Sequence, residues 1–369
     1  VLQTWQHGKL IRSSQLFDDL ISPLSARSED EWVESFREAF STAVRRQLVS
    51  DAPVSIMLSG GLDSSAVALE AVRGGASFKT AYTISYSPED MRLDQQSDDL
   101  RYARLVADRL GLDLKVIPAD RNLLALLPEI SHFLEDGISD PAALNTFLIC
   151  RAARNQGVKV MLTGQGADEY LAGYRRHRAF DVLGRMPWWQ KAILKVVSAR
   201  IPPSVPGRFN SLARRIRRLG QLLQKDPADR IVDLFTWIDQ EALAGMFVQS
   251  LEGGRIGTGI VEAFGESGAL GEVEALLRVD QAYDLRSLNL TYCDRLSMAV
   301  GVEARVPFLD FDLVRLMNSL PPSMKLRGGE GKYVLKKAME GRLPREVIYR
   351  EKAGFGLPMR AWLRQESAL

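Results

Sequence analysis

Apolar and polar positions follow two different rhythms along the chain. Between about residues 51 and 180, four short apolar runs alternate with segments of helical periodicity, and these runs lie at 53–58, 79–86, 113–117 and 158–163. Apolar runs of this length, bounded by turn residues, favour buried strands. Strands that alternate with helices predict an α/β fold, built on a mainly parallel, twisted sheet with helices on both faces. Ligands of such sheets bind beyond the carboxyl ends of the strands.

The predicted helices of this part have recognisable ends. Ser28 and Glu31 form a capping box at the start of the first one, in which each side chain bonds a free backbone amide of the other residue. Its apolar face consists of Trp32, Phe36, Phe40, Val44 and Leu48. Later helices are predicted over 64–73, from a cap at Ser97 to Leu110 before Gly111, and from Asp140-Pro141 to Gly157. Beyond about residue 180 the pattern is helical to the end of the chain.

The composition narrows the classes of function only slightly. Of 369 residues, 46% are hydrophobic and 25% charged, enough to bury a sizeable core. The net charge of +2 neither favours nor excludes binding to nucleic acid, because a chain of this net charge can still carry a basic patch on one part of its surface. Cys150 and Cys293 have no metal-ligand spacing and are expected to be buried free thiols, which suits a cytoplasmic location. No apolar run approaches the length of a membrane span, so no membrane partner is expected.

The most informative segment is the string Ser59-Gly60-Gly61-Leu62-Asp63-Ser64-Ser65, which follows a predicted strand and opens a predicted helix. Adjacent glycines let backbone amides approach an anion, and the helix that follows points its positive end at the same place. Asp63 would repel a phosphate unless a cation lay between them. The string therefore predicts a polyphosphate site with Mg²⁺. A turn that merely caps a helix is the plain alternative, which the strand–loop–helix context disfavours.

This string resembles the pyrophosphate loop of the ATP pyrophosphatases, in the version found in asparagine synthetases. Three later segments resemble the same family in the same order: a second nucleotide loop at 162–174, an acid-substrate segment at 294–310, and a C-terminal segment made of 331–333 and 350–356. The resemblance covers residues 54–360. It implies an adenine nucleotide hydrolase-like fold. It also implies an ATP-dependent carbon–nitrogen ligase that adenylates a carboxylate, releases pyrophosphate and transfers the acyl group to ammonia.

The resemblance also implies roles for single residues. It makes Asp63 and Asp168 ligands of Mg²⁺ on the β- and γ-phosphates, and it makes Lys352 the lysine that stabilises the charged α-phosphate in the transition state. The residues expected to hold ATP are Leu58, Ser59, Gly60, Gly61, Asp63, Ser64, Ser65, Ile84, Thr163 and Gly164. Plainer roles stay open, namely a helix cap for Asp168, a surface position for Lys352, and strand core for Leu58 and Ile84.

A further set borders the acid substrate by resemblance, and it consists of Asp294, Arg295, Glu303 and Arg305. Arginine can hold a carboxylate with two parallel hydrogen bonds. An ion pair between Glu303 and Arg305 that only braces the fold is an equally good interpretation. The acid itself is aspartate, a related acid or a larger one such as a sugar acid.

Gln165 stands at a catalytic position and departs from the family pattern. Asparagine synthetases carry Glu there, and this Glu is thought to take a proton from the attacking ammonia. A primary amide cannot act as a base at any ordinary pH. Because relatives that form β-lactams carry Tyr at this position, Gln165 weakens the case for asparagine formation without weakening adenylation. Asp136, next to Glu135, is a candidate replacement base.

Both ends of the chain look cut relative to the family. Glutamine-dependent members begin with a glutaminase domain that releases ammonia, and residues 1–12 resemble its last hairpin. The other expected parts are a helical lead-in at 13–50, an ATP-binding α/β core at 51–180, a variable helical region at 181–290, and a helical part at 291–369 that completes the active site. Since the first residue is Val1 and not Met, we expect a processed product or a piece of a longer protein.

Two other functions remain open. A lactam-forming synthetase of the same superfamily would join an acid to an internal amine. A pyrophosphate-loop enzyme that modifies tRNA would use the basic residues Arg175, Arg176, His177, Arg178, Arg208, Arg214, Arg215, Arg217 and Arg218. Such arginines usually line a solvated helix face, and aromatic side chains are sparse among them, so a nucleic-acid partner is disfavoured. The oligomeric state, including a homodimer, is left open.

Overall fold

The protein, described here by a computed structural model, forms two compact units. Unit 1 comprises Val1–Leu171, Thr291–Lys325 and Lys332–Leu369, and unit 2 comprises Ala172–Leu290 and Leu326–Gly331. Within these ranges the structure describes residues 2–6, 8–14, 27–87, 89–90, 98–138, 140–202, 210–236, 245–246, 257–266, 271–350, 357, 359 and 362–363.

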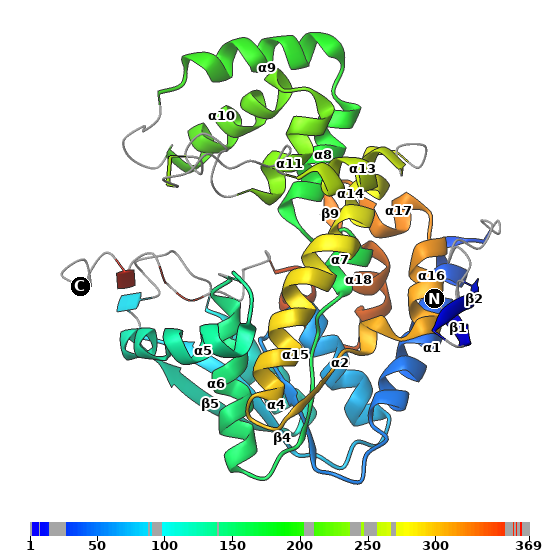
Figure 1. Ribbon diagram of the computed structural model, residues 1–369, viewed down its shortest axis with the longest axis vertical. Helices are drawn as coiled ribbons and strands as arrows, with labels where there is room; N and C mark the ends of the chain where they lie inside the picture. Colours follow the sequence, from blue (N-terminus) through cyan, green and yellow to red (C-terminus); the bar gives the residue numbers. More distant parts are fainter. Residues whose placement is uncertain are drawn as a thin grey trace. The chain divides into compact units, whose positions relative to one another are not determined.

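The regular elements are labelled in chain order (Figure 1). The strands are β1 (Leu2–Gln6), β2 (Lys9–Ser14), β3 (Val54–Met57), β4 (Thr80–Tyr86), β5 (Asp113–Ala119), β6 (Val160–Leu162), β7 (Glu303–Arg305), β8 (Leu326–Arg327) and β9 (Glu330–Gly331). The helices up to residue 200 are α1 (Glu29–Gln47), α2 (Leu62–Arg73), α4 (Asp99–Leu110), η1 (Arg121–Leu126), α5 (Leu127–Leu134), α6 (Ala142–Asn155), α7 (Ala167–Tyr170), α8 (Arg175–Arg185) and α9 (Trp188–Arg200). The later ones are α10 (Asn210–Gln224), α11 (Pro227–Phe235), α13 (Thr258–Glu266), α14 (Glu272–Val279), η4 (Asp280–Asn289), α15 (Leu290–Met298), η5 (Pro307–Leu309), α16 (Phe311–Ser319), α17 (Pro322–Lys325), α18 (Tyr333–Met339) and α19 (Arg345–Ile348).

Five parallel strands form the sheet of unit 1, in the order β5-β4-β3-β6-β7. In the register, Val54 of β3 lies opposite Val160 of β6, and Val160 lies opposite Glu303 of β7. The predicted parallel sheet is confirmed, and each of the four predicted strands is present with ends that differ by at most two residues. The fifth strand, β7, comes from a segment that the sequence analysis assigned to the substrate.

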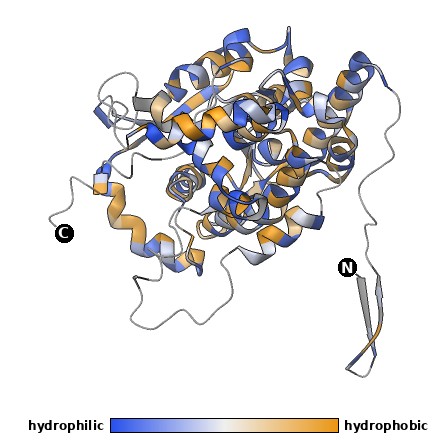
Figure 2. Ribbon diagram, turned by 90° about the horizontal axis from the view of Figure 1, so that it is seen from above, coloured by the Kyte–Doolittle hydropathy of each residue, from blue (hydrophilic) through white to orange (hydrophobic). Residues whose placement is uncertain are grey.

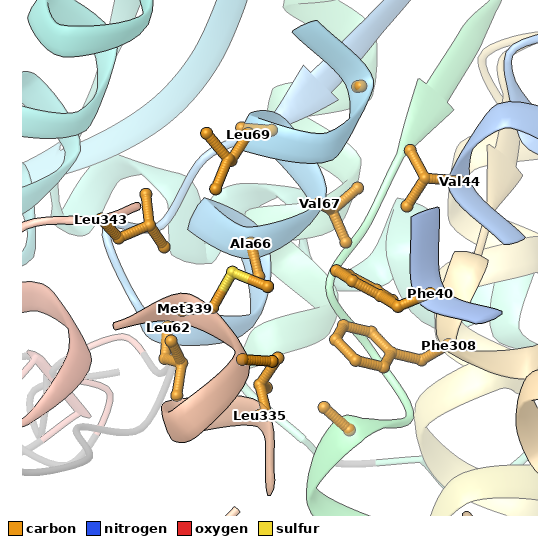
Figure 3. Close-up of a cluster of buried hydrophobic side chains, with 14 of the residues drawn as sticks. Phe40, Val44, Leu62, Ala66, Val67, Leu69, Phe308, Leu335, Met339 and Leu343 are labelled. Atoms are coloured by element: carbon orange, nitrogen blue, oxygen red, sulfur yellow. The ribbon is translucent and has the colours of Figure 1, made fainter. Parts of the chain in front are cut away.

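The main core of unit 1 anchors α2 against the sheet. Phe40 of α1 stacks on Phe308 with ring centroids 4.7 Å apart. Val67 of α2 and Leu335 of α18 belong to the same buried cluster (Figure 3). Burial of each large apolar side chain contributes about 1.5–3 kcal/mol relative to an exposed position. The start of α2 is therefore fixed where β3 ends.

The helix ends mostly follow the predicted signals. At the start of α1, the amide of Ser28 donates to Glu31 Oε2 at 2.7 Å and the amide of Glu31 donates to Ser28 Oγ at 3.3 Å, so the capping box is present. The predicted cap at Ser97 is wrong by one residue, because Asp98 caps α4 by accepting a bond from the amide of Arg101 at 3.1 Å. Ser97 itself lies outside the described residues.

Unit 2 is built from helices and the small β8–β9 hairpin. In Figure 2, hydrophobic and hydrophilic residues alternate along the helices. Arg176 donates to the fully buried Asp280 at 2.6 and 3.0 Å, and its guanidinium lies 4.1 Å from the ring centre of Tyr174. His177 also contacts Asp280 and is fully buried. These two basic residues therefore serve packing inside the unit, which removes them from the candidate nucleic-acid surface. Among the described helices, none is both long and apolar enough to cross a membrane.

Candidate active site

The loop after β3 is held by hydrogen bonds of its own. The amide of Leu58 donates to the carbonyl of Tyr82 at 2.8 Å, which extends the pairing of β3 with β4 by one residue, up to the start of the loop. The hydroxyls of Ser59 and Ser64 lie 3.0 Å apart, the amide of Ser59 donates to Ser64 Oγ at 3.2 Å, and the amide of Gly61 donates to Ser59 Oγ at 3.3 Å. The loop is therefore held in a defined turn by its own hydrogen bonds, at the N-terminus of α2 where an anion can bind.

Gly60 is needed for the shape of this loop. Its φ is +71°, in the left-handed region, and a Cβ at this position would lie 2.5 Å from the amide nitrogen of Ala103 and 2.7 Å from the carbonyl oxygen of Asp99. Only glycine fits both the backbone conformation and the close approach of α4. The carbonyl of Gly60 also accepts a hydrogen bond from Arg350 Nη1 at 2.8 Å.

The second predicted loop, after β6, packs directly on the start of α2. The amide of Thr163 donates to the carbonyl of Arg305 in β7 at 2.9 Å. A Cβ at Gly164 would lie 2.6 Å from the amide nitrogen of Ser64, so the two loops are in backbone contact. The structure thus brings together the two segments that the sequence assigned to the nucleotide, as expected for loops at the carboxyl edge of one sheet.

Asp63 and Asp168 share one buried ammonium group. Lys332 Nζ lies 2.6 Å from Asp63 Oδ2 and 2.7 Å from Asp168 Oδ1, and the three side chains are exposed by 9%, 19% and 15% respectively. Burial by itself lowers the pKa of Lys332, but the charges of Asp168 and Asp63 outweigh burial and hold that pKa above its usual value. Lys332 is therefore a permanent cation between two carboxylates.

Lys332 is a site residue that the sequence pattern does not single out. It lies in the C-terminal segment that resembles the family, in which the resemblance assigns a role to Lys352 alone. Its backbone is left-handed, with φ of 58°, and its amide donates to the carbonyl of Leu171 at 2.7 Å. The flanking Gly331 and Tyr333 were a weak signal, because nothing in the local sequence connects residue 332 with residues 63 and 168.

The presence of Lys332 changes the interpretation of Asp63. From the sequence, an acid in an anion site indicates Mg²⁺, whereas in the structure the ammonium of Lys332 lies between Asp63 and Asp168. In the described part of the chain, no group of three or more His, Cys, Asp or Glu is placed to hold a metal. Mg²⁺ typically takes one or two carboxylates together with phosphate oxygens and water, so this pair fits an ion that arrives with a polyphosphate.

Three buried polar atoms near these loops have no hydrogen-bond partner among the described residues. They are Ser65 Oγ, Thr163 Oγ1 and Gln165 Oε1. Leaving a buried polar atom unsatisfied costs about 1–3 kcal/mol, so such atoms usually mark a ligand or an ordered water. Ser65 and Thr163 lie in the two predicted nucleotide loops, and their hydroxyls are suited to phosphate oxygens.

Gln165 is oriented by a buried tyrosine. Its Nε2 donates to the hydroxyl of Tyr292 at 3.3 Å. Burial raises the pKa of Tyr292 well above its ordinary value, so this hydroxyl stays protonated.

Burial also raises the pKa of Asp140, whose Oδ1 accepts a bond from the amide of Ala142 at 2.8 Å. Asp136, the candidate replacement base, is exposed.

Three of the residues assigned to the acid substrate bond other parts of the protein, and their role toward a substrate stays a prediction. Arg305 donates to Glu303 at 2.7 Å and to the carbonyls of Gln47 and Val49 at 2.8 and 2.7 Å, which ties β7 to the end of α1. This matches the bracing interpretation of that pair. Arg295 donates to the carbonyl of Leu134 at 3.0 Å and pairs with the exposed Glu135, and Asp294 is exposed.

The remaining predicted residues divide into buried and undescribed ones. Leu58 and Ile84 are 0% and 5% exposed, which satisfies the strand-core role and leaves adenine packing a prediction. Cys150 and Cys293 are buried free thiols, as expected. Lys352 lies outside the described residues. Arg350, two positions earlier in the sequence, bonds Gly60 and pairs with Asp99.

Comparison with known proteins places this geometry in context. A family model described as asparagine synthase matches residues 35–368. The glutamine-hydrolyzing asparagine synthetase 1 of Bacillus subtilis is 29% identical over 342 residues, which are 92% of this chain and 51% of that protein. Asparagine synthetase 3 of the same organism is 29% identical over 343 residues, with 89% and 49% covered.

A fungal protein with a different name matches over a similar length. Amidase chry2 of Gibberella zeae is 27% identical over 378 residues, which cover 91% of this chain and 54% of that protein. The chain thus spans about half the length of the curated relatives it matches. A solved NMN synthetase from Francisella tularensis overlaps with a TM-score of 0.26 and 20% identity, covering 40% of this chain and 59% of that one.

Proposed function

Because the chain belongs to the asparagine synthase family, we propose that it binds ATP with Mg²⁺ in the cradle of the 59–65 and 163–168 loops and uses it to activate a carboxylate. The product of that step is an acyl-adenylate, with pyrophosphate released, and the acyl group then passes to ammonia or an amine. One observation carries the proposal. Asp63 and Asp168, one from each of two glycine-containing loops that are in backbone contact, meet at Lys332.

The acidic, basic and neutral side chains of the cradle have different roles in this proposal. Mg²⁺, when bound, neutralises the β- and γ-phosphate oxygens and makes pyrophosphate a better leaving group. Asp63 and Asp168 are the carboxylates that would hold it. Lys332 already lies between them, so its ammonium can bind the phosphate oxygens that enter. The free hydroxyls of Ser65 and Thr163 supply neutral donors on either side.

We also propose that Lys352 stabilises charge on the α-phosphate. Its support is the family resemblance and the contact of Arg350, two positions earlier in the sequence, with the carbonyl of Gly60 in the phosphate loop. A positively charged donor that strengthens its contact in the transition state acts on the rate and not on ground-state binding.

The acceptor side of the site contains Gln165, which we propose orients the amine without deprotonating it. Its Nε2 donates a hydrogen bond to the hydroxyl of Tyr292, and its Oε1 can accept a bond from an N–H group of the acceptor. The amine must then arrive unprotonated or lose its proton to water. The acid is aspartate, a related acid or a larger one. Because Gln165 departs from the Glu of asparagine synthetases, a lactam-forming synthetase is the alternative function.

The test is exchange of labelled pyrophosphate into ATP, measured across a panel of carboxylic acids that includes aspartate and sugar acids. An acid that supports exchange is an adenylation substrate. Asp63→Asn should abolish this acid-dependent exchange, because it removes a charged metal ligand from the phosphate site. Asp108→Asn, at an exposed carboxylate of α4, is the matched control and should exchange normally. Near-normal exchange by folded Asp63→Asn protein would contradict the proposal.

A further inference from the structure

Helix α9 of unit 2 presents a broad apolar face to solvent. Trp188 and Trp189 at its start are 80% and 50% exposed, and Ile193, Val196 and Val197 further along are 55%, 53% and 46% exposed. At 100° per residue, these five side chains and the alanines between them occupy about half of the helix circumference. Large apolar side chains gathered in this way mark an interaction surface and not ordinary surface scatter.

The opposite side of α9 is the one that packs inside the unit. Ser198 is 3% exposed and faces α10, which runs beside α9 in Figure 1. A Cβ at Gly220 of α10 would lie 1.8 Å from Ser198 Oγ, so the two helices touch at this point. The contact fixes the rotation of α9 and leaves its tryptophan face outward.

The surrounding sequence carries a strong local charge. Residues 182–225, which contain α9 and α10, hold ten Lys and Arg and no Asp or Glu, in a chain whose net charge is +2. Arg185 and Lys225, at the two ends, pair with Asp181 and Asp233. On α9 itself, the exposed Lys195 lies at one border of the apolar face, and the exposed Arg200 is the last residue of the helix. The occupant of this surface must therefore be apolar at its centre and anionic around it.

We propose that α9 docks in the plane of an anionic phospholipid bilayer. Tryptophans prefer the interface between headgroups and acyl chains, and an amphipathic helix of this type buries its apolar face about 5–10 Å into that boundary while basic residues contact the headgroups. A nucleic acid would use the charge but would leave the aliphatic side chains Ile193, Val196 and Val197 without a role. A protein interface would not gather so many cations around an uncompensated core. This inference is independent of the reaction proposed for unit 1.

The test is sedimentation of the full chain with lipid vesicles. Vesicles of phosphatidylcholine with about 30% phosphatidylglycerol should retain the protein, and vesicles of phosphatidylcholine alone should retain much less. Raising the salt concentration from 0.05 to about 0.5 M should release a large part of it, because surface electrostatics are screened within a Debye length.

Two variants test the two components of the surface. Trp188→Ala with Trp189→Ala should lower the fraction of protein bound to anionic vesicles by about tenfold or more, since two large interfacial side chains are lost. Lys195→Glu with Arg200→Glu should lower it by about the same factor. The matched controls are Trp5→Ala, at an exposed tryptophan of β1, and Arg104→Glu with Arg109→Glu, an exposed pair of the same spacing on α4. Circular dichroism checks that every variant is folded.

Several results would overturn the proposal. Failure of the wild-type chain to sediment with anionic vesicles, or equal binding by the tryptophan variant, rules out lipid docking through α9. Concentration-dependent dimerisation that disappears in the tryptophan variant would assign the face to a second copy of the chain. Retention of a single-stranded oligonucleotide, with no retention of vesicles, would assign it to nucleic acid.

Discussion

Lys332 lies where two acidic groups from distant parts of the chain converge. Its ammonium pairs with both Asp63 and Asp168. Removing one partner of a buried ion pair is strongly destabilising, because the charges that remain are left uncompensated. The same side chain is therefore expected to serve stability before ATP binds and phosphate binding afterwards.

Lys332→Met should lose both roles. We expect the free energy of unfolding to fall by about 3 kcal/mol and pyrophosphate exchange to fall at least a hundredfold, roughly. Mg²⁺ alone should then raise the melting temperature of the variant more than that of the wild type, since it replaces the missing cation. Lys336→Met, at a buried lysine of α18, the helix that follows Lys332, is the control; its ammonium lies 5.3 Å from the ring centre of Tyr349. An active, stable Lys332→Met protein would refute the assignment.

Lys352→Ala should separate rate from affinity. We expect ATP binding to change little and the adenylation rate to fall about a hundredfold or more, because the contact forms mainly in the transition state. Isothermal titration with ATP and single-turnover adenylation measure the two quantities. Equal losses in both would make Lys352 a binding residue only.

Gln165→Glu should distinguish a missing base from a recognition role. If Gln165 only orients ammonia, the wild-type amidation rate should rise with pH as more ammonia is unprotonated, and the variant should amidate faster near neutral pH with unchanged exchange. If Gln165 contacts a polar group of a larger acid, the new carboxylate should repel the acid and lower exchange instead. The two rates, measured across pH in both proteins, decide between these roles. No change in either rate would exclude both.

At the scale of elements, the site depends on loops that only the packed sheet brings together. The strands and turns of 51–180 were predictable from apolar runs and glycine positions, because parallel strands buried on both faces are continuous and hydrophobic. Strand β7 was not, since Glu303-Ala304-Arg305 is short and polar and becomes a strand through pairing with β6. Lys332 was missed for a similar reason, as its partners lie far away in the sequence.

Gly164→Ala tests the contact between the two loops. The added Cβ would lie 2.6 Å from the amide nitrogen of Ser64, so the second loop must move away from α2. We expect a loss of about 1–3 kcal/mol in the free energy of unfolding, from overpacking, together with weaker binding of ATP. Gly265→Ala is the control, because a Cβ there would meet nothing within 4 Å, and it should be neutral or slightly stabilising. Unchanged nucleotide affinity in Gly164→Ala would show that the contact is dispensable.

For the whole molecule, the division into two units predicts where a nucleotide acts. The described residues that were assigned to ATP or Mg²⁺ all belong to unit 1, whereas α9 and α10 belong to unit 2. Hydrogen exchange with and without a non-hydrolysable ATP analogue and Mg²⁺ should show protection at 59–65, 163–168 and around Lys332. Amides of α9 and α10 should exchange unchanged. Protection that appears mainly in unit 2 would contradict the assignment of the site.

The separation of 269 residues between Asp63 and Lys332 has a consequence for synthesis. A chain grows at about 5–20 residues per second, and its N-terminal parts fold first. Asp63 and Asp168 can therefore come together on the ribosome long before their lysine exists. Until residue 332 emerges, the two carboxylates lack the ammonium that lies between them in the finished protein. We expect the loops after β3 and β6 to stay loosely packed in chains arrested before that point, so that charge compensation in the cradle is one of the last steps of folding.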